Sequence, residues 1–270
     1  MDTTSVCWNL TSACNMSCQY CFRELSESAQ SLEVNMGILD NLIAMGVKRI
    51  TFSGGEPFMY PYLLDLINKA HEAGIKCYVV TNGSLLNEEN VRALLEHIDK
   101  ITFSCDSPRE IVNETIGRST TDGKDSYRHI RNIIPLIRYY YPDILIDINT
   151  VVTYDPYHEY RELDYMIDAI RNDLLKNDIN KWKIIRFYPL SGKASSNKDR
   201  FSLDNDEFLE IKKEYESMNG YLKIDVRDIK DIDDNLIVSP CGYLKQSLNG
   251  EETILVDLKP SLKKGCERHV

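Results

Sequence analysis

Apolar residues occur along the first 190 positions in two alternating patterns, short runs rich in β-branched residues and longer stretches with helical spacing. The short runs predict strands at residues 5–10, 48–53, 76–81, 100–104, 144–153 and 181–188. The longer stretches predict helices at residues 32–45, 62–73, 87–97, 124–140 and 160–174. Strands that alternate with crossover helices pair in parallel, so this pattern predicts an α/β fold with its active site at the carboxyl ends of the strands.

The number of strand–helix units limits the architecture. About six units fit before residue 190, and a closed barrel requires eight, so we expect a partial (βα)6 TIM-like barrel in residues 1–190. Residues 191–200 are rich in Ser, Gly, Lys and Asn, which predicts a mobile loop. We expect residues 191–270 to form a small α+β cap over the open side of the barrel. Its predicted elements are a helix at 204–217 and short strands that include 235–239 and 252–258, with a hairpin turn at Asn249-Gly250.

Composition and charge narrow the class of protein. Hydrophobic residues make up 43% of the chain and charged residues 27%, which excludes disordered and low-complexity classes. The formal net charge of −10 argues against a broad nucleic-acid surface but leaves room for a local basic pocket. No apolar run approaches the roughly 18 residues of a membrane span, and residues 1–9 lack the features of a signal peptide. We therefore expect a cytoplasmic protein with neither a nucleic-acid nor a membrane partner.

Three of the eight cysteines lie close together, as Cys14, Cys18 and Cys21 in a CxxxCxxC pattern after the first predicted strand. Thiolates are soft ligands that suit iron–sulfur clusters and zinc. A structural zinc site takes four ligands, usually as two separated pairs, and the sequence has no second CxxC pair. Three thiolates can bind three irons of a [4Fe–4S] cluster and leave the fourth iron open. Zinc binding and three buried, unliganded cysteines remain as alternatives.

A second motif, Ser53-Gly54-Gly55-Glu56-Pro57, follows the second predicted strand. Glycines let the backbone approach a ligand closely, and a carboxylate can accept from an ammonium group. The alternative is an ordinary turn between a strand and a helix. Together with the cysteines, this motif resembles the radical S-adenosylmethionine (SAM) superfamily. The resemblance implies one [4Fe–4S] cluster on the three cysteines and SAM bound to the open iron. It also implies reductive cleavage of SAM to a 5′-deoxyadenosyl radical, which abstracts a hydrogen atom from the substrate.

Further stretches are similar to the viperin-like members of this superfamily, which act in antiviral defence. In chain order they are residues 50–58, 81–85, 104–107, 116–118, 148–152 and 181–183. The resemblance implies a SAM site made of Gly54, Gly55, Glu56, Thr81, Asn82, Ser104 and Arg118. A guanidinium such as that of Arg118 pairs well with a carboxylate on chemical grounds alone, although a solvated loop charge is the alternative.

The viperin-like resemblance also implies the reaction and the substrate. Such enzymes are lyases that dehydrate a nucleoside triphosphate to its 3′-deoxy-3′,4′-didehydro analogue, with an electron donor such as flavodoxin or ferredoxin. The implied substrate residues are Asn149, Lys181 and Lys183, and we expect Arg186 to point the same way by alternation along the strand. A solvated strand end is the alternative for these cations. Two residues depart from the family pattern: Asp147 stands in place of a lysine, where it would repel a triphosphate, and Cys7 stands in place of an asparagine.

A radical SAM enzyme with a non-nucleotide substrate, such as a peptide epimerase or a sugar-modifying enzyme, remains an alternative. Only Cys241 and Cys266 lie beyond residue 190, too few for a second four-cysteine cluster. An epimerase could use a lone thiol as hydrogen donor, and Cys241, between Pro240 and Gly242, is the candidate. A half-buried turn cysteine is the simpler explanation for that residue. An electron carrier or a zinc-bound adaptor would have no use for the glycine-rich motif.

Overall fold

The computed structural model describes residues 5–23, 28–94, 96–120, 122–123, 126–153, 161–174, 179–220, 222–228, 231, 236–248 and 251–260. The strands are β1 (Ser5–Thr11), β2 (Arg49–Gly54), β3 (Lys76–Thr81), β4 (Lys100–Ser104), β5 (Leu145–Val152), β6 (Lys181–Arg186), β7 (Lys223–Arg227), β8 (Leu236–Val238), β9 (Tyr243–Leu248) and β10 (Glu251–Asp257). The helices are α1 (Leu32–Ala44), η1 (Pro57–Met59), α2 (Leu63–Glu72), α3 (Glu88–Leu94), α4 (Glu110–Thr115), α5 (Ser126–Tyr140), α6 (Arg161–Ala169), η2 (Ile170–Leu174), α7 (Gly192–Ser196), α8 (Lys198–Phe201) and α9 (Asn205–Ser217).

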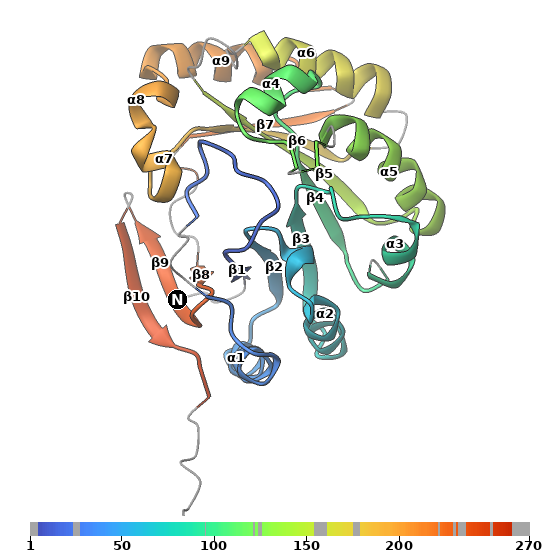
Figure 1. Ribbon diagram of the computed structural model, residues 1–270, viewed down its shortest axis with the longest axis vertical. Helices are drawn as coiled ribbons and strands as arrows, with labels where there is room; N and C mark the ends of the chain where they lie inside the picture. Colours follow the sequence, from blue (N-terminus) through green and yellow to red (C-terminus); the bar gives the residue numbers. More distant parts are fainter. Residues whose placement is uncertain are drawn as a thin grey trace, which may run out of the picture.

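The ten strands of the described residues belong to one sheet, in the order β10-β9-β8-β1-β2-β3-β4-β5-β6-β7. Strands β1 to β7 are parallel to their neighbours, and the sheet curves so that α1, α2, α5 and α6 lie along its outer side (Figure 1). Parallel neighbours in sequential order are the arrangement that crossover helices produce. The predicted partial barrel is therefore confirmed.

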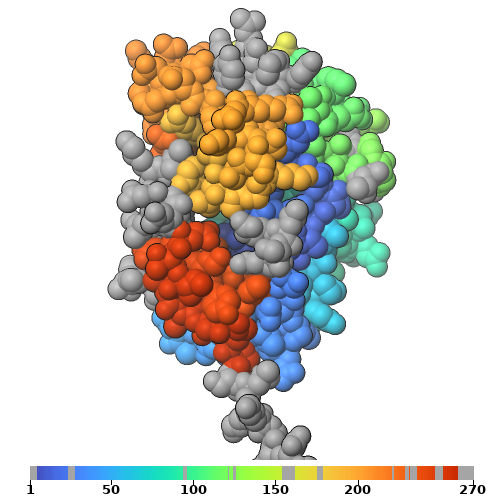
Figure 2. All heavy atoms as spheres, turned by 60° about the vertical axis from the view of Figure 1, so that its left-hand side comes forward, coloured from blue at the N-terminus to red at the C-terminus, as the bar shows by residue number. Residues whose placement is uncertain are grey.

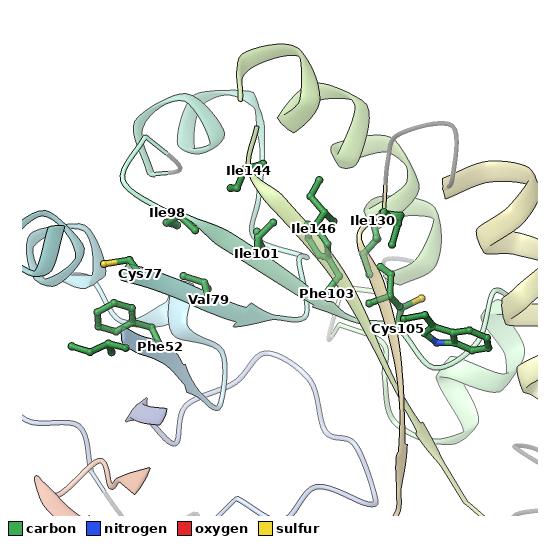
Figure 3. Close-up of a cluster of buried hydrophobic side chains, with 14 of the residues drawn as sticks. Phe52, Cys77, Val79, Ile98, Ile101, Phe103, Cys105, Ile130, Ile144 and Ile146 are labelled. Carbon is green, nitrogen blue, oxygen red and sulfur yellow. The ribbon is translucent and has the colours of Figure 1, made fainter. Parts of the chain in front are cut away.

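Alternation along each strand separates a helix-facing core from a polar interior. Ile101, Phe103, Ile146 and Ile148 are completely buried, and Figure 3 shows several of these side chains directed into one apolar layer. Residues at the intervening positions face the inside of the barrel. Cys77 is also completely buried in the apolar layer, so its thiol serves packing. Because successive side chains of a strand point to opposite faces, burial of the apolar face against the helices directs the other face of each strand into the barrel.

The segment after residue 190 differs in part from expectation. Residues 191–200 were expected to form a mobile loop, but they form most of α7 and α8, because Ala194 and Phe201 are completely buried against Tyr20 and Phe187. Figure 2 shows these helices, in yellow and orange, beside the blue N-terminal loop.

Helix α9 leads into β7, which extends the parallel sheet beyond the six predicted strands, while β8 to β10 extend the other edge. One sheet thus runs across residue 190, and the two-domain division stays a prediction. Strands β9 and β10 pair antiparallel as expected, although the predicted turn at Asn249-Gly250 lies outside the described residues, as does Cys266. Within the described part of the chain, no helix has the length and apolar character needed to cross a membrane.

Candidate functional site: the cysteine loop and the barrel interior

The three motif cysteines, all half-buried, lie on the loop that follows β1. Backbone hydrogen bonds attach this loop to several separate segments of the chain. They run from Glu56 N to Ala13 O (2.8 Å), Ser17 N to Gly117 O (3.1 Å), Gln19 N to Ile116 O (2.9 Å) and Ala194 N to Cys21 O (3.0 Å). Protein contacts therefore fix the loop near its start, in its middle and at Cys21.

Glycines allow the segments around the loop to approach it closely. A Cβ atom on Gly55 would lie 2.0 Å from the carbonyl oxygen of Ala13, and one on Gly117 would lie 2.4 Å from that of Ser17. Real Cβ contacts are never this short, and Gly117 in addition has a φ of +75°, which disfavours other residues. The glycines of both sequence motifs are thus required by the cysteine loop itself.

Glu56 is fully buried just after the end of β2, and its carboxylate accepts hydrogen bonds from other residues of the chain. It accepts hydrogen bonds from Thr81 Oγ1 (2.6 Å), Asn82 N (2.8 Å) and Phe58 N (3.2 Å). Burial raises the pKa of Glu56 to about 7, although these hydrogen bonds act in the opposite direction. These three donors leave acceptor capacity on the carboxylate, so its expected contact with an ammonium group stays a prediction. Glu56 also joins the ends of β2 and β3.

The residues after β3 lie directly against the cysteine loop. The side-chain amide of Asn82 donates to Asn15 Oδ1 at 2.9 Å and lies 3.8 Å from Cys14 Sγ. Asn15 in turn donates to Ser84 Oγ at 2.8 Å. The Thr81-Asn82 turn thus lies next to the first cysteine.

Arg118 forms a buried ion pair with Asp106, and its Nε donates to the hydroxyl of Tyr20 at 2.9 Å. That hydroxyl donates to Asp106 Oδ2 at 2.5 Å, and the backbone N–H of Val151 donates to Asp106 Oδ1 at 2.7 Å. The Asp106 carboxylate beside it raises the pKa of Arg118 well above its ordinary value, despite burial. Sequence reasoning assigned Arg118 to a carboxylate of SAM but did not find Tyr20 and Asp106. Both lie within motifs already singled out, between Cys18 and Cys21 and after Ser104.

The donor chemistry of the loop distinguishes a cluster from a single ion. Among the described residues, no three His, Cys, Asp or Glu side chains converge on one ion position. A mononuclear zinc site requires such convergence, whereas in a [4Fe–4S] cluster each thiolate binds a different iron. Three soft donors on one fixed loop therefore fit a [4Fe–4S] cluster with one open iron.

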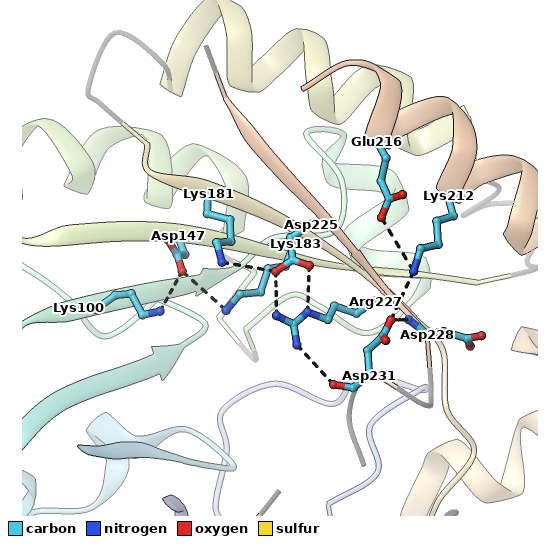
Figure 4. Close-up of polar contacts among 10 residues, drawn as sticks. All are labelled: Lys100, Asp147, Lys181, Lys183, Lys212, Glu216, Asp225, Arg227, Asp228 and Asp231. Carbon is cyan, nitrogen blue, oxygen red and sulfur yellow. Dashed lines mark hydrogen bonds and ion pairs between the residues drawn. The ribbon is translucent and has the colours of Figure 1, made fainter. Parts of the chain in front are cut away.

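The predicted substrate residues of β5 and β6 face the inside of the barrel. Asn149 on β5 is paired in register with Lys183 on β6. Two residues earlier on each strand, Asp147 is paired with Lys181. The side-chain oxygen of Asn149 is buried and has no hydrogen-bond partner among the described residues. Figure 4 shows Lys181, Lys183 and Asp147 on the side of the sheet away from the helices. The sequence prediction correctly brings these residues together.

Arg186 does not join this group. It is five positions from Lys181 and three from Lys183, so alternation places it on the opposite face, with Trp182. Its guanidinium forms an ion pair with Asp228 at 3.2 Å and lies 5.0 Å from the centre of the Phe208 ring. The expectation that it points the same way as the lysines is therefore wrong.

A cavity of about 310 Å³ lies between the cysteine loop and the C-terminal strands. Ser53 and Gly54 of β2 line one side, and Ser239 and Pro240 line another. Cys241, the alternative hydrogen donor, is half-buried next to Pro240. Cys7 is half-buried on β1, and burial raises the pKa of its thiol to about 11, which disfavours a thiolate.

The fold and these motifs agree with comparisons to known proteins. A model of the radical SAM superfamily matches residues 8–164. The chain belongs to the radical SAM superfamily. Members of this superfamily are enzymes that use a [4Fe–4S] cluster and SAM, so these are the cofactors of this radical SAM enzyme.

Two curated relatives carry the same kind of name. This radical SAM enzyme is 29% identical over 254 residues to an S-adenosylmethionine-dependent nucleotide dehydratase of Flammeovirga pacifica, across 91% of this chain and 83% of the relative. It is 27% identical over 231 residues to S-adenosylmethionine-dependent nucleotide dehydratase RSAD2 of Oncorhynchus mykiss, across 80% of this chain and 62% of the relative. Against five other relatives of that name, it spans 45% to 64% of the relative's length.

Solved structures show the same fold. The chain superposes on Streptococcus suis SuiB bound to S-adenosylmethionine with a TM-score of 0.69 at 16% identity. The match covers 96% of this chain and 64% of SuiB.

Proposed function

We propose that this radical SAM enzyme is a nucleotide dehydratase of the viperin-like kind. It would remove water from the ribose of a nucleoside triphosphate and give the 3′-deoxy-3′,4′-didehydro nucleotide. The observation that supports this most is the pairing of Asn149 with Lys183 inside the barrel. It places an amide oxygen that has no hydrogen-bond partner among the described residues one strand from a half-buried ammonium group. A nucleotide offers hydroxyl donors for the first group and phosphate oxygens for the second. Relatives named nucleotide dehydratases add independent support.

When bound, the cluster and SAM supply one-electron cleavage of the sulfonium and a group that abstracts a substrate hydrogen atom. The chain's own residues bind and orient both reactants. We assign the SAM position to the carboxyl ends of β2, β3 and β4, lined by Gly54, Gly55, Thr81, Asn82, Ser104 and Arg118. Glu56 holds two of these strand ends in place through its buried hydrogen bonds. Cys14, Cys18 and Cys21 would hold the cluster.

The remaining parts of the chain follow from this assignment. Residues 1–190 would form the catalytic core, and residues 191–270 would cover it, with α7 bonded to the cysteine loop through Cys21. The reaction consumes electrons, and we assign their delivery to a small electron carrier of the flavodoxin or ferredoxin kind.

The direct test supplies CTP, UTP, GTP and ATP in turn to the anaerobic enzyme with SAM and dithionite. We expect one of them to raise 5′-deoxyadenosine release above background and to yield a product lighter by one water. Release that no nucleotide stimulates would contradict the proposal. It would leave a non-nucleotide substrate, such as a peptide for an epimerase that uses Cys241 or a sugar, as the better explanation.

A variant separates substrate binding from the chemistry of SAM. Lys183→Met removes a half-buried ammonium group, so we expect the KM for the nucleotide to rise by about tenfold or more. SAM cleavage without substrate should change by less than about twofold, because Lys183 lies on β6, away from the proposed SAM position. Lys213→Met, at an exposed position of α9, is the matched control and should leave both unchanged. Equal losses in nucleotide KM and SAM cleavage would argue against the assignment.

A further inference from the structure

Charged side chains from β4, β5, β6 and β7 meet inside the barrel, and the cations outnumber the anions. Figure 4 shows this interior cluster on one side of the sheet. Its members on these four strands are Lys100, Lys181, Lys183 and Arg227, with two carboxylates, Asp147 and Asp225. Arg227 donates two hydrogen bonds, of 2.9 and 3.0 Å, to the carboxylate of Asp225, and Lys181 Nζ lies 3.4 Å from the same carboxylate.

Asp147 is shared between two lysines on opposite sides. Its Oδ2 lies 3.1 Å from Lys100 Nζ on β4 and 3.7 Å from Lys183 Nζ on β6. The carboxylate is 4% exposed, whereas the lysine side chains are 17% and 22% exposed. Lys100 Nζ also lies 4.5 Å from the centre of the Tyr78 ring, so the apolar barrel wall and the carboxylate together hold it in place. No motif or spacing in the sequence singles out Lys100.

One carboxylate cannot neutralise two ammonium groups. The pKa of Lys183 is lowered, first by burial and then by the positive charge of Lys100, while Asp147 only partly offsets this. An excess of half-buried positive charge favours binding of a further anion. This resolves the difficulty that a carboxylate at position 147 raises for a triphosphate, because Asp147 is already paired on both sides.

We propose that Lys100 is an additional cation of the polyphosphate site, and that Asp147 is its counter-ion, which the phosphate partly displaces. The inference rests on the proposed function, since it names the phosphate-binding groups of the same site. Asp147 and a polyphosphate compete for the same two ammonium groups. Removal of Lys100 therefore weakens polyphosphate binding, and removal of the negative charge at Asp147 strengthens it. A purely structural role would make both changes weaken binding.

The test measures binding without turnover. The reconstituted enzyme with SAM and no reductant is titrated calorimetrically with two probes, inorganic tripolyphosphate and the nucleoside triphosphate that supports turnover. For Lys100→Met we expect about a tenfold or greater loss of affinity for both probes, and for Asp147→Asn a gain of about threefold or more. Lys100→Arg keeps the charge and should stay within about threefold of wild type.

Lys212→Met is the matched control. Lys212 also lies near two carboxylates, Glu216 at 3.9 Å and Asp231 at 3.5 Å, but it lies on α9. We expect this variant to bind both probes as wild type does. The affinity should also fall less steeply with salt in Lys100→Met than in wild type, because one ion pair with phosphate is missing.

The outcomes separate this inference from the proposed function. Wild-type enzyme that binds neither probe would refute both. Wild-type binding that Lys100→Met leaves unchanged would overturn the role of Lys100 alone, and weaker binding by Asp147→Asn would overturn its role as counter-ion. If Lys100→Met fails to fold, Lys100→Arg and Asp147→Asn still decide, since retained affinity in the first and increased affinity in the second are both required.

Discussion

The buried ion pair between Asp106 and Arg118 gives the sharpest stability prediction. Asp106 is 1% exposed and accepts from Tyr20 and from the backbone of Val151, as well as pairing with Arg118. The substitution Asp106→Asn keeps the shape of the side chain but removes its charge. It leaves the guanidinium of Arg118, 8% exposed, without its counter-ion.

The expected magnitude follows from burial. Breaking a buried ion pair by removing one partner costs about 3–5 kcal/mol, because the remaining charge is neither solvated nor paired. Asp257→Asn removes one partner of an exposed pair with Lys259, at 3.3 Å, and should cost less than about 1 kcal/mol. The two substitutions are chemically identical and differ in burial, so their difference isolates the effect of desolvation.

The assay is anaerobic urea unfolding followed by far-UV circular dichroism, with cluster absorbance recorded in parallel. We expect Asp106→Asn to lower the free energy of unfolding by about 3 kcal/mol and to loosen the cluster, since Tyr20 lies between two of its ligands. Adding Arg118→Met to Asp106→Asn should recover about 1 kcal/mol or more relative to the sum of the single changes. An Asp106→Asn protein within about 1 kcal/mol of wild type would refute the reasoning, and so would strictly additive effects in the double variant.

Two further predictions concern the segment after β2. Gly55→Ala should lower the iron content and visible absorbance of the reconstituted enzyme by more than about half, because its methyl group would overlap the backbone of Ala13. Iron analysis checks this against a Gly220→Ala control, where the nearest atom would lie 4.0 Å from the added methyl group. Glu56 has a folded pKa of about 7 against an ordinary 4.5, so its stabilising contribution is complete below pH 4.5 and is lost as the pH rises to 7, by about 3 kcal/mol. Urea unfolding of wild type and Glu56→Gln measures the free energy of unfolding across this pH range. We expect it to fall with pH less steeply in the variant than in wild type. Equal slopes in the two proteins would argue against a buried, titrating carboxylate.

Much of the barrel could be predicted because each strand carries its own signal. The predicted strands at 76–81 and 100–104 match β3 and β4 residue for residue. In β3 buried residues alternate with more exposed ones, whereas in β4 the three central residues are all buried. The cysteine spacing and the Gly54-Gly55 pair identified the family for a similar reason, since their chemistry is local in sequence.

Features that depend on tertiary contacts could not be found in this way. The polar segment 192–201 is helical only because Ala194 and Phe201 pack against the cysteine loop, which no local pattern shows. The closeness of Lys100 to Asp147 depends on the register of two strands 45 residues apart in sequence. The same applies to Glu56, whose carboxylate lies against Thr81 of the next strand. Arg186 is different, because simple counting along β6 would have placed it on the helix-facing side.

The close contacts at Gly55 and Gly117 have a consequence for how the enzyme responds to oxygen. Because the surrounding backbone, rather than iron, holds the cysteines in place, destruction of the inorganic core by oxygen should leave the scaffold intact. Repair then requires only that iron and sulfide reach the preformed cysteine loop, and the polypeptide does not have to refold.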